Sequence, residues 1–291
     1  MQTKKDIQRL LASAGVGPNR RFGQHFLVDL NLMRLLLDSA RIRPDDVVLE
    51  VGSGTGSLTT ALAERAGRVV TVEIDDTLAG VAGAELAGIT NVRLIHGDVL
   101  SSKGALNPAV TGALDEAFKA YQGRFLLVAN LPYDVACPLM LNLVKGPLVA
   151  EQMVVTVQKE VADRMAAAPG GKDYGALSVL LGATGSVEVL RTLKPSVFWP
   201  PPAVNSAIVR FIRDDEKCRA IKDMAVFGQV VSLFLGHRRK MLRACAKHAP
   251  ETLAPADRWS DLFDQCQIDP TQRPEGLSPA QYVALANLCG V

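Results

Sequence analysis

An apolar strand that runs directly into a glycine-rich turn is the feature of this chain that most constrains its fold. Residues 47–51 are apolar apart from Glu50, and Gly52, Gly54 and Gly56 follow at once. Glycines in such a turn allow left-handed backbone conformations and let a ligand approach the amide N–H groups closely. The pattern therefore predicts a strand, a ligand-binding turn and a helix, the unit from which open α/β folds are built.

The spacing of these glycines argues against a dinucleotide-binding turn. That site requires G-x-G-x-x-G, whereas the glycines here follow G-x-G-x-G and position 57 is Ser. Glu50 also stands two positions before the first glycine. An acidic residue followed by alternating glycines in this way is the pattern of enzymes that use S-adenosylmethionine, in which no pyrophosphate has to be bound.

Patterns typical of strands and helices alternate from residue 30 onward, which predicts a parallel sheet with helices on both faces. Two further strands, expected at 187–193 and 206–212, bracket a proline-rich link that resembles a hairpin return. After Arg213 the pattern is helical, so we predict two domains, residues 1–213 and 214–291. The earlier strands are expected near Val47, Val69, Val92, Phe125 and Met153. Two helices are expected over residues 30–39 and 113–120, and four more are expected to begin at Ser57, Leu78, Pro138 and Lys159.

Carboxylates stand at the ends of two neighbouring strands. Glu73 ends the strand that begins at Val69, and Asp98 follows the strand 92–95 and Gly97. The first carboxylate can bind both hydroxyls of a ribose, and the second can accept a hydrogen bond from an adenine amino group. Alone, Glu73 could be a solvated strand end and Asp98 a turn former. Their order after the glycine turn favours ligand binding.

The strand 125–129 ends in the tetrapeptide Asn130-Leu131-Pro132-Tyr133. The amide oxygen of Asn130 and the carbonyl of Leu131 can accept both hydrogens of a planar amino group, and Tyr133 offers a ring on which a base can stack. Pro132 fixes the turn. Such tetrapeptides mark methyltransferases that act on the amino group of adenine or cytosine. The alternative is an ordinary turn between a strand and a helix.

Over nearly its whole length the chain resembles the ribosomal RNA adenine dimethyltransferases, and within them the bacterial small-subunit (16S) branch, the KsgA type. No single motif is decisive, but their order and spacing together are specific. Two departures are visible: His25 stands where the family usually has Asn, and the stretch from Asp98 to Phe125 is longer than expected. Besides the motifs above, the resemblance is carried by residues 21–27, 73–75, 158–164, 172–179, 198–206 and 237–243.

The resemblance implies an α/β fold with a seven-stranded, Rossmann-like S-adenosylmethionine methyltransferase sheet, whose last strand is antiparallel, and a small C-terminal helical domain that binds RNA or the ribosome. It implies dimethylation of N6 of two adjacent adenines in a hairpin loop near the 3′ end of 16S rRNA, with S-adenosyl-L-methionine as cofactor, during small-subunit biogenesis. The expected catalytic residues are Asn130, Leu131, Tyr133 and Phe198, the last of which could instead be core. The expected cofactor contacts are His25, Leu27, Gly52, Gly54, Glu73, Asp98 and Asn130.

The net charge of +2 conceals an uneven distribution of charged residues. Residues 1–43 carry eight Lys/Arg against three Asp/Glu, and residues 191–250 carry twelve against four. Basic excess at both ends suits a phosphate-binding surface, although charge runs are often only solvated faces. We expect RNA contacts from Arg20, Arg21, Arg238, Arg239 and Lys240, with the last three on a helix that flanking apolar residues pin to the core.

Composition excludes several classes of protein. The five cysteines form no C-x-x-C pair and no His/Cys cluster, so we expect reduced thiols and no metal. No apolar run approaches the roughly 20 residues of a membrane span, and the polar start of the chain suggests neither a signal peptide nor an anchor. We expect a monomeric cytoplasmic protein whose partner is the RNA of the small ribosomal subunit.

Three alternative functions remain. A large-subunit 23S rRNA dimethylase of the antibiotic-resistance type shares the tetrapeptide, but residues 273–279 and an expected loop at 172–179 resemble the small-subunit branch. A DNA adenine methyltransferase would need a further sequence-recognition region, which we do not find. A ribosome-assembly factor that binds RNA and methylates only in order to leave is compatible with the sequence, and the two roles can coexist.

Overall fold

The computed structural model describes residues 1–19 and 23–289 and divides into two compact units. Unit 1 consists of Met1–Ala162 and Glu188–Phe211, and unit 2 of Asp163–Val187 and Ile212–Val291. The grouping differs from a single boundary at residue 213, because it assigns the segment Asp163–Val187 to unit 2. The reason is packing within unit 2: the hydroxyl of Tyr174, for example, donates to the carbonyl of Leu277 at 2.8 Å.

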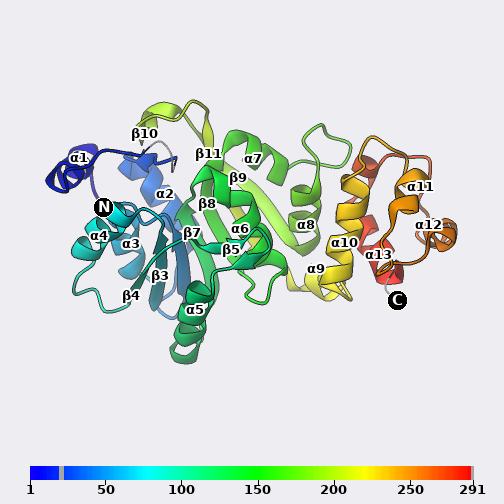
Figure 1. Cartoon of the computed structure of the whole chain (residues 1–291), viewed down its shortest axis with the longest axis horizontal. Coiled ribbons are helices and arrows are strands. Elements are labelled where there is room, and N and C mark those ends of the chain that lie inside the picture. Colours follow the sequence, from blue (N-terminus) through cyan, green and yellow to red (C-terminus); the bar gives the residue numbers. More distant parts are fainter. Residues whose placement is uncertain (20–22, 290–291) are drawn as a thin grey trace. The chain divides into compact units, whose positions relative to one another are not determined.

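A seven-stranded sheet forms the centre of unit 1, in the order β4-β3-β2-β7-β8-β11-β9 (Figure 1). The pairs β4–β3, β3–β2, β2–β7 and β7–β8 are parallel. Parallel strands present their carboxyl ends at one edge, where ligands of open α/β folds bind. The predicted seven-stranded sheet is confirmed. Its strands are β2 (Val47–Val51), β3 (Arg68–Glu73), β4 (Val92–His96), β7 (Phe125–Asn130), β8 (Gln152–Gln158), β9 (Gly185–Leu193) and β11 (Ser206–Arg213).

The helices between the strands follow the predicted alternation, with two differences. One helix begins at Tyr133, not at Pro138: Pro138 lies inside it, and the burial of Ala136, Leu139 and Met140 along the same helix offsets the backbone hydrogen bond that proline cannot make. A further helix at the start of the chain was not predicted; Thr3 caps it, and its buried Ile7 and Leu11 pack on Leu78. The helices are α1 (Lys4–Ser13), α2 (Leu30–Ala40), α3 (Ser57–Ala63), α4 (Asp76–Glu85), α5 (Pro108–Ala120), α6 (Tyr133–Lys145) and α7 (Lys159–Met165).

Two short strand pairs modify the expected loops of unit 1. The proline-rich link is not a simple hairpin return: it contains a 3-10 turn, η2 (Pro195–Val197), and the strand β10 (Phe198–Trp199), which pairs with β1 (Phe26–Leu27). This pairing joins the proline-rich link to the segment that contains His25. The long stretch after Asp98 contains the hairpin of β5 (Leu100–Ser102) and β6 (Ala105–Leu106), followed by α5.

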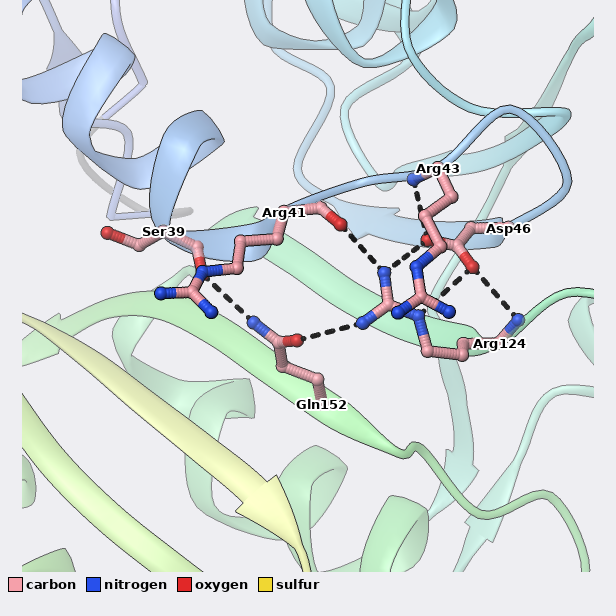
Figure 2. A network of polar contacts seen from close by, with 6 residues as sticks. All are labelled: Ser39, Arg41, Arg43, Asp46, Arg124 and Gln152. Carbon is pink, nitrogen blue, oxygen red and sulfur yellow. Dashed lines mark hydrogen bonds and ion pairs between the residues drawn. The ribbon is translucent and has the colours of Figure 1, made fainter.

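A polar network closes the amino ends of β2 and β7 (Figure 2). The carboxylate of Asp46, which is fully buried, accepts hydrogen bonds from the backbone N–H groups of Arg43 and Arg124 at 2.8 and 2.9 Å and from the Arg124 guanidinium at 2.6 Å. The guanidinium also donates to the carbonyl of Arg41 at 2.7 Å. Gln152 donates to the carbonyl of Ser39 at 3.0 Å. The network thereby connects the end of α2 to three strands of the sheet.

Unit 2 is helical, which confirms the expected character of the C-terminal region. Its core is aromatic, with Phe234 in contact with Trp259, Phe263 and Tyr282. The segment expected as a loop at 172–179 enters a helix at Ala176. The elements are α8 (Ala176–Thr184), α9 (Asp215–Arg219), α10 (Met224–Leu235), α11 (Leu242–Cys245), η3 (Ala246–His248), η4 (Ala256–Arg258), α12 (Trp259–Gln265), η5 (Pro274–Gly276) and α13 (Pro279–Cys289). Within the described residues of both units, no helix has the length and apolar character needed to cross a membrane.

Candidate active site

The glycine turn between β2 and α3 has the backbone conformation that its sequence predicts. Gly52 and Gly54 have φ of 85° and 57°, in the left-handed region that favours glycine. A Cβ atom at Gly54 would lie 3.0 Å from the ring of Phe26, and one at Gly52 would lie 3.4 Å from the ring of Pro132. Glycine therefore lets the turn pass closely between β1 and the tetrapeptide.

The carboxylate of Glu73 is fixed at the end of β3 by two backbone donors. Its Oε2 accepts from the N–H of Gly54 at 2.8 Å, and its Oε1 accepts from the N–H of Asp75 at 3.0 Å. Burial raises the pKa of Glu73, and these two hydrogen bonds oppose the rise. Each carboxylate oxygen has a second lone pair, so Glu73 can still accept hydrogen bonds from a ligand.

Asp98 lies beyond β4 and is exposed. Its Oδ1 accepts from the N–H of Leu100 at 2.9 Å, and its backbone carbonyl accepts from the side chain of Asn107 at 2.9 Å. These contacts hold the Asp98 carboxylate at the beginning of the β5–β6 hairpin.

The tetrapeptide ends β7 and begins α6. Asn130 donates through Nδ2 to the carbonyl of His25 at 2.9 Å, which leaves its oxygen Oδ1 as the end available to accept. Leu131 is buried, and its N–H donates to the carbonyl of Thr156 at 3.2 Å. The hydroxyl of Tyr133 is hydrogen-bonded to the hydroxyl of Ser206 at 2.8 Å. These contacts hold Asn130, Leu131 and Tyr133 in place without using Oδ1 of Asn130 or the carbonyl of Leu131.

A cavity of about 440 Å³ brings most of the predicted residues together, and its volume suits a cofactor-sized ligand. Leu27 is the exception among the cofactor residues: it lines a smaller neighbouring cavity of about 60 Å³. Phe198 is buried, yet it also lines the larger cavity, so core packing and a role in the site are compatible. The predicted residues that line the larger cavity are His25, Gly52, Gly54, Glu73, Asp98, Asn130, Leu131, Tyr133 and Phe198.

His25 connects two walls of the cavity. Its ring nitrogen Nδ1 lies 2.7 Å from the carbonyl oxygen of Pro200, and its ring centroid lies 5.8 Å from that of Tyr133. Its backbone carbonyl accepts the hydrogen bond from Asn130. The side chain of His25, which stands where the family usually has Asn, is therefore hydrogen-bonded to the proline-rich link through Nδ1.

Sequence reasoning missed several residues that line the cavity. Gln24 donates to the carboxylate of Asp75 at 3.0 Å, and its place in the motif 21–27 was the signal for it. Lys103 lines the cavity from the tip of the β5–β6 hairpin, where its carbonyl accepts from Asn142 at 3.1 Å. The extra length after Asp98 was the only signal for this hairpin.

Arg238, Arg239 and Lys240 of unit 2 are not on a helix, so that expectation is wrong. Helix α10 ends at Leu235, and Arg238, Arg239 and Lys240 lie exposed in the turn that follows. The Lys240 ammonium lies 2.8 Å from Nε2 of His248, and its charge is the main cause of a lowered His248 pKa. Arg20 and Arg21 lie outside the described residues. Across residues 1–19 and 23–289, no group of three or more His, Cys, Asp or Glu could hold a metal ion.

On the prediction that Glu73 binds the ribose of S-adenosylmethionine, Glu73→Ala is expected to weaken binding of this cofactor by about 1 to 3 kcal/mol, because charge-assisted hydrogen bonds would be lost. Calorimetric titration measures this directly. Glu85→Ala is a matched control, since it removes a carboxylate from α4 that does not line the cavity. Equal affinity of the Glu73 variant and the native protein would remove Glu73 from the site.

Known proteins resemble this chain in sequence and in fold. The family model of ribosomal RNA adenine dimethylase matches residues 17–289. The chain is 38% identical over 281 residues to the ribosomal RNA small subunit methyltransferase A of Geobacillus thermodenitrificans, covering 96% of this chain and 94% of that protein. It is 37% identical over 286 residues to the protein of that name from Streptomyces coelicolor, covering 97% and 94%.

Two solved structures have a similar fold. A dimethyladenosine transferase from Plasmodium falciparum has a TM-score of 0.72 at 23% identity, over 90% of this chain and 96% of that one. The 23S rRNA methyltransferase ErmE has a TM-score of 0.62 at 25% identity, over 90% and 98%. Since the family model spans nearly the whole chain and the relatives align over nearly their full length, this chain belongs to the ribosomal RNA adenine dimethylase family.

Proposed function

We propose that the protein uses S-adenosyl-L-methionine to dimethylate N6 of two adjacent adenines in a hairpin loop near the 3′ end of 16S rRNA, within the small ribosomal subunit. The observation that carries this proposal is that one cavity is lined by all of Glu73, Asp98, Asn130 and Leu131. We assign Glu73 and Asp98 to the cofactor, and Asn130 and Leu131 to the target amine. Membership of the family supports adenine in ribosomal RNA as the substrate. We infer that the enzyme works as a monomer in the cytoplasm.

The residues of the cavity fit S-adenosylmethionine. The carboxylate of Glu73 retains lone pairs for a ribose, and Asp98 can accept from the adenine amino group of the cofactor. The turn at Gly52 and Gly54 has no side chains, so a ligand can lie against the backbone there. We infer that His25 and Leu27 complete the cofactor site from the side of β1.

When bound, S-adenosylmethionine supplies an electrophilic methyl group on a positively charged sulfur, so little acid–base chemistry is required of the protein. Asn130 Oδ1 and the Leu131 carbonyl accept the two N6 hydrogens, orient the nitrogen lone pair and stabilise the positive charge that develops on nitrogen. The ring of Tyr133, held by Ser206, stacks on the target adenine, and Phe198 closes the opposite face.

The second methylation places a further demand on the same residues. After one transfer only one N6 hydrogen remains, so either Asn130 or Leu131 loses its partner and the site must accommodate a methyl group. Membership of the dimethylase family supports both transfers.

A large-subunit target is the main alternative. The relatives named for the small subunit reach 38% identity over 96% of this chain, whereas ErmE reaches 25%, and this difference favours the small subunit. The test is methyl transfer from labelled cofactor to naked 16S rRNA, small subunits and large subunits. We expect label in the small subunit only, near the 3′ end of its RNA. Label confined to large subunits would refute the proposal.

We infer that Arg238, Arg239 and Lys240 bind RNA phosphates, since all three are exposed in one turn of unit 2. Replacing all three by Ala should weaken small-subunit binding and flatten its dependence on salt, because fewer counterions are released. Binding is measured by co-sedimentation at several salt concentrations. Arg219, Lys222 and Arg258 are also exposed in unit 2, so their triple Ala variant removes the same charge from elsewhere. Equal effects of the two variants would contradict a specific role for the turn.

A further inference from the structure

Glu50 on β2 is a buried carboxylate whose two oxygens have different surroundings. The residue is 1% exposed. Its Oε2 accepts hydrogen bonds from the hydroxyls of Thr59 at 2.6 Å and Thr71 at 2.7 Å. Its Oε1 has no hydrogen-bond partner among the described residues. Because Oε2 already accepts two donors, a proton bound by Glu50 resides on Oε1.

Glu50 lines the smaller cavity of about 60 Å³, together with Ser53, whose hydroxyl likewise has no partner within the described residues. This cavity shares Gly52, Gly54 and Asn130 with the larger one. In the proposed function the transferred methyl lies against Asn130, and so does the positive sulfur that carries it. The sulfonium charge is therefore brought close to the cavity that Glu50 lines.

The groups packed around Glu50 leave its charge poorly compensated. Burial raises the pKa of Glu50 to about 7, the two threonine hydroxyls oppose the rise, and the nearby carboxylate of Glu73 adds to it. From α1 and α2 the same cavity is lined by the apolar side chains of Ile7, Met33 and Leu36. The imidazole of His25 lines the larger cavity. None of these surrounding groups is a lysine or arginine, so a cationic ligand would supply the missing positive charge.

We propose that Glu50 is a specificity residue that distinguishes the sulfonium cofactor from its product S-adenosylhomocysteine, in which the sulfur is a neutral thioether. This inference rests on the proposed function. Transfer moves the methyl to N6, which gives up a proton to water, while the electron pair of the broken S–C bond stays on sulfur and the charge on sulfur disappears. A cation next to Glu50 favours the ionised carboxylate; once the charge is gone, Glu50 takes up a proton from water and the ligand is held less tightly.

Calorimetric titration of the full chain with each of the two ligands, between about pH 6 and pH 8, tests this inference because the range brackets the Glu50 pKa. In the native protein the affinity ratio favouring S-adenosylmethionine should rise by about tenfold across this range. In Glu50→Gln the ratio should be smaller and change much less. The titrations of the ligands themselves are common to both proteins, so they cancel in the comparison. Near neutral pH the cofactor should also release part of a proton from the native protein only, seen by comparing buffers of different ionisation enthalpy.

A second variant tests the same inference from the opposite side. Thr71→Val removes one donor to Oε2, which raises the Glu50 pKa further, so the rise in the ratio should move to higher pH. Thermal unfolding checks the fold. The pKa of Glu50 is raised in the folded protein, so ionisation opposes folding as pH rises; Glu50→Gln should therefore gain thermal stability relative to the native protein toward pH 8.

The outcomes separate the two proposals. A ratio that changes with pH equally in the native protein and in the Glu50→Gln variant, or equal losses of affinity for both ligands, would overturn the role of Glu50 while leaving the proposed function intact. Failure of the native protein to bind either ligand would overturn the proposed function and this inference with it.

Discussion

Asn130→Ala is expected to lower the single-turnover rate of methyl transfer by at least about 100-fold, the scale seen when one preorganised hydrogen-bonding group is removed from a reacting centre. In the native protein the Asn130 amide is held by its bond to the carbonyl of His25, so Oδ1 is positioned before the substrate arrives. In the proposed mechanism, alanine removes the acceptor that orients N6 and stabilises the positive charge developing on it. Rates are measured with small subunits at saturating cofactor, so that a secondary loss of cofactor affinity is masked.

The same variant should still bind the small subunit, because we assign that binding to basic surface residues and not to the tetrapeptide. Co-sedimentation and thermal unfolding accompany the rate measurement. A rate close to that of the native protein would contradict the catalytic role of Asn130. Loss of subunit binding together with the rate would instead make Asn130 a structural residue.

Asp46→Ala is expected to lower the free energy of unfolding by about 3 kcal/mol, the lower end of the range for breaking a buried ion pair. Removing this carboxylate leaves the Arg124 guanidinium, whose side chain is only 21% exposed, without its counter-charge. It also removes the acceptor for the backbone N–H groups of Arg43 and Arg124. Urea unfolding measures the loss. Cofactor affinity of the folded variant should be unchanged, because the network lies at the amino ends of the strands (Figure 2).

Asp38→Ala is the matched control for this prediction. Asp38 and Arg65 also form an ion pair, at 2.8 Å, but their side chains are 66% and 38% exposed. Water screens such a pair, so its loss should cost under about 1 kcal/mol. Comparable losses for the two variants would show that burial does not set the strength of the Asp46–Arg124 pair.

The sequence predicted the parts of the fold that local patterns determine. The strand before Gly52 and a parallel sheet flanked by helices follow from apolar runs and turns, and these place Glu73 and Asn130 at one edge of the sheet, whereas its seven strands came from the family resemblance. The carboxyl ends of parallel strands meet there, so the cavity followed from topology. That Phe198 lines the cavity was expected only from the family resemblance. Local patterns could not show it, because Phe198 reaches the cavity through the pairing of β10 with β1, which joins residues far apart in the chain.

The features that the sequence did not predict depend on tertiary contacts. Helix α1 has only Ile7 and Leu11 buried, and they pack on residues such as Leu78 and Trp199 from elsewhere in the chain. The Asp46–Arg124 pair joins residues 78 positions apart. Helix α8 is almost wholly buried, so it has no polar face to mark it in the sequence.

The measurement that tests the central claim most directly is the identity of the nucleoside that receives the methyl group. Small subunits are incubated with labelled S-adenosylmethionine and the native protein, the RNA is digested to nucleosides, and the labelled product is identified by mass spectrometry. We predict label in N6,N6-dimethyladenosine, with N6-methyladenosine as the intermediate at short times. Label in a methylated cytidine, or on a ribose hydroxyl, would contradict an amine-binding site built on Asn130 and Leu131 for adenine.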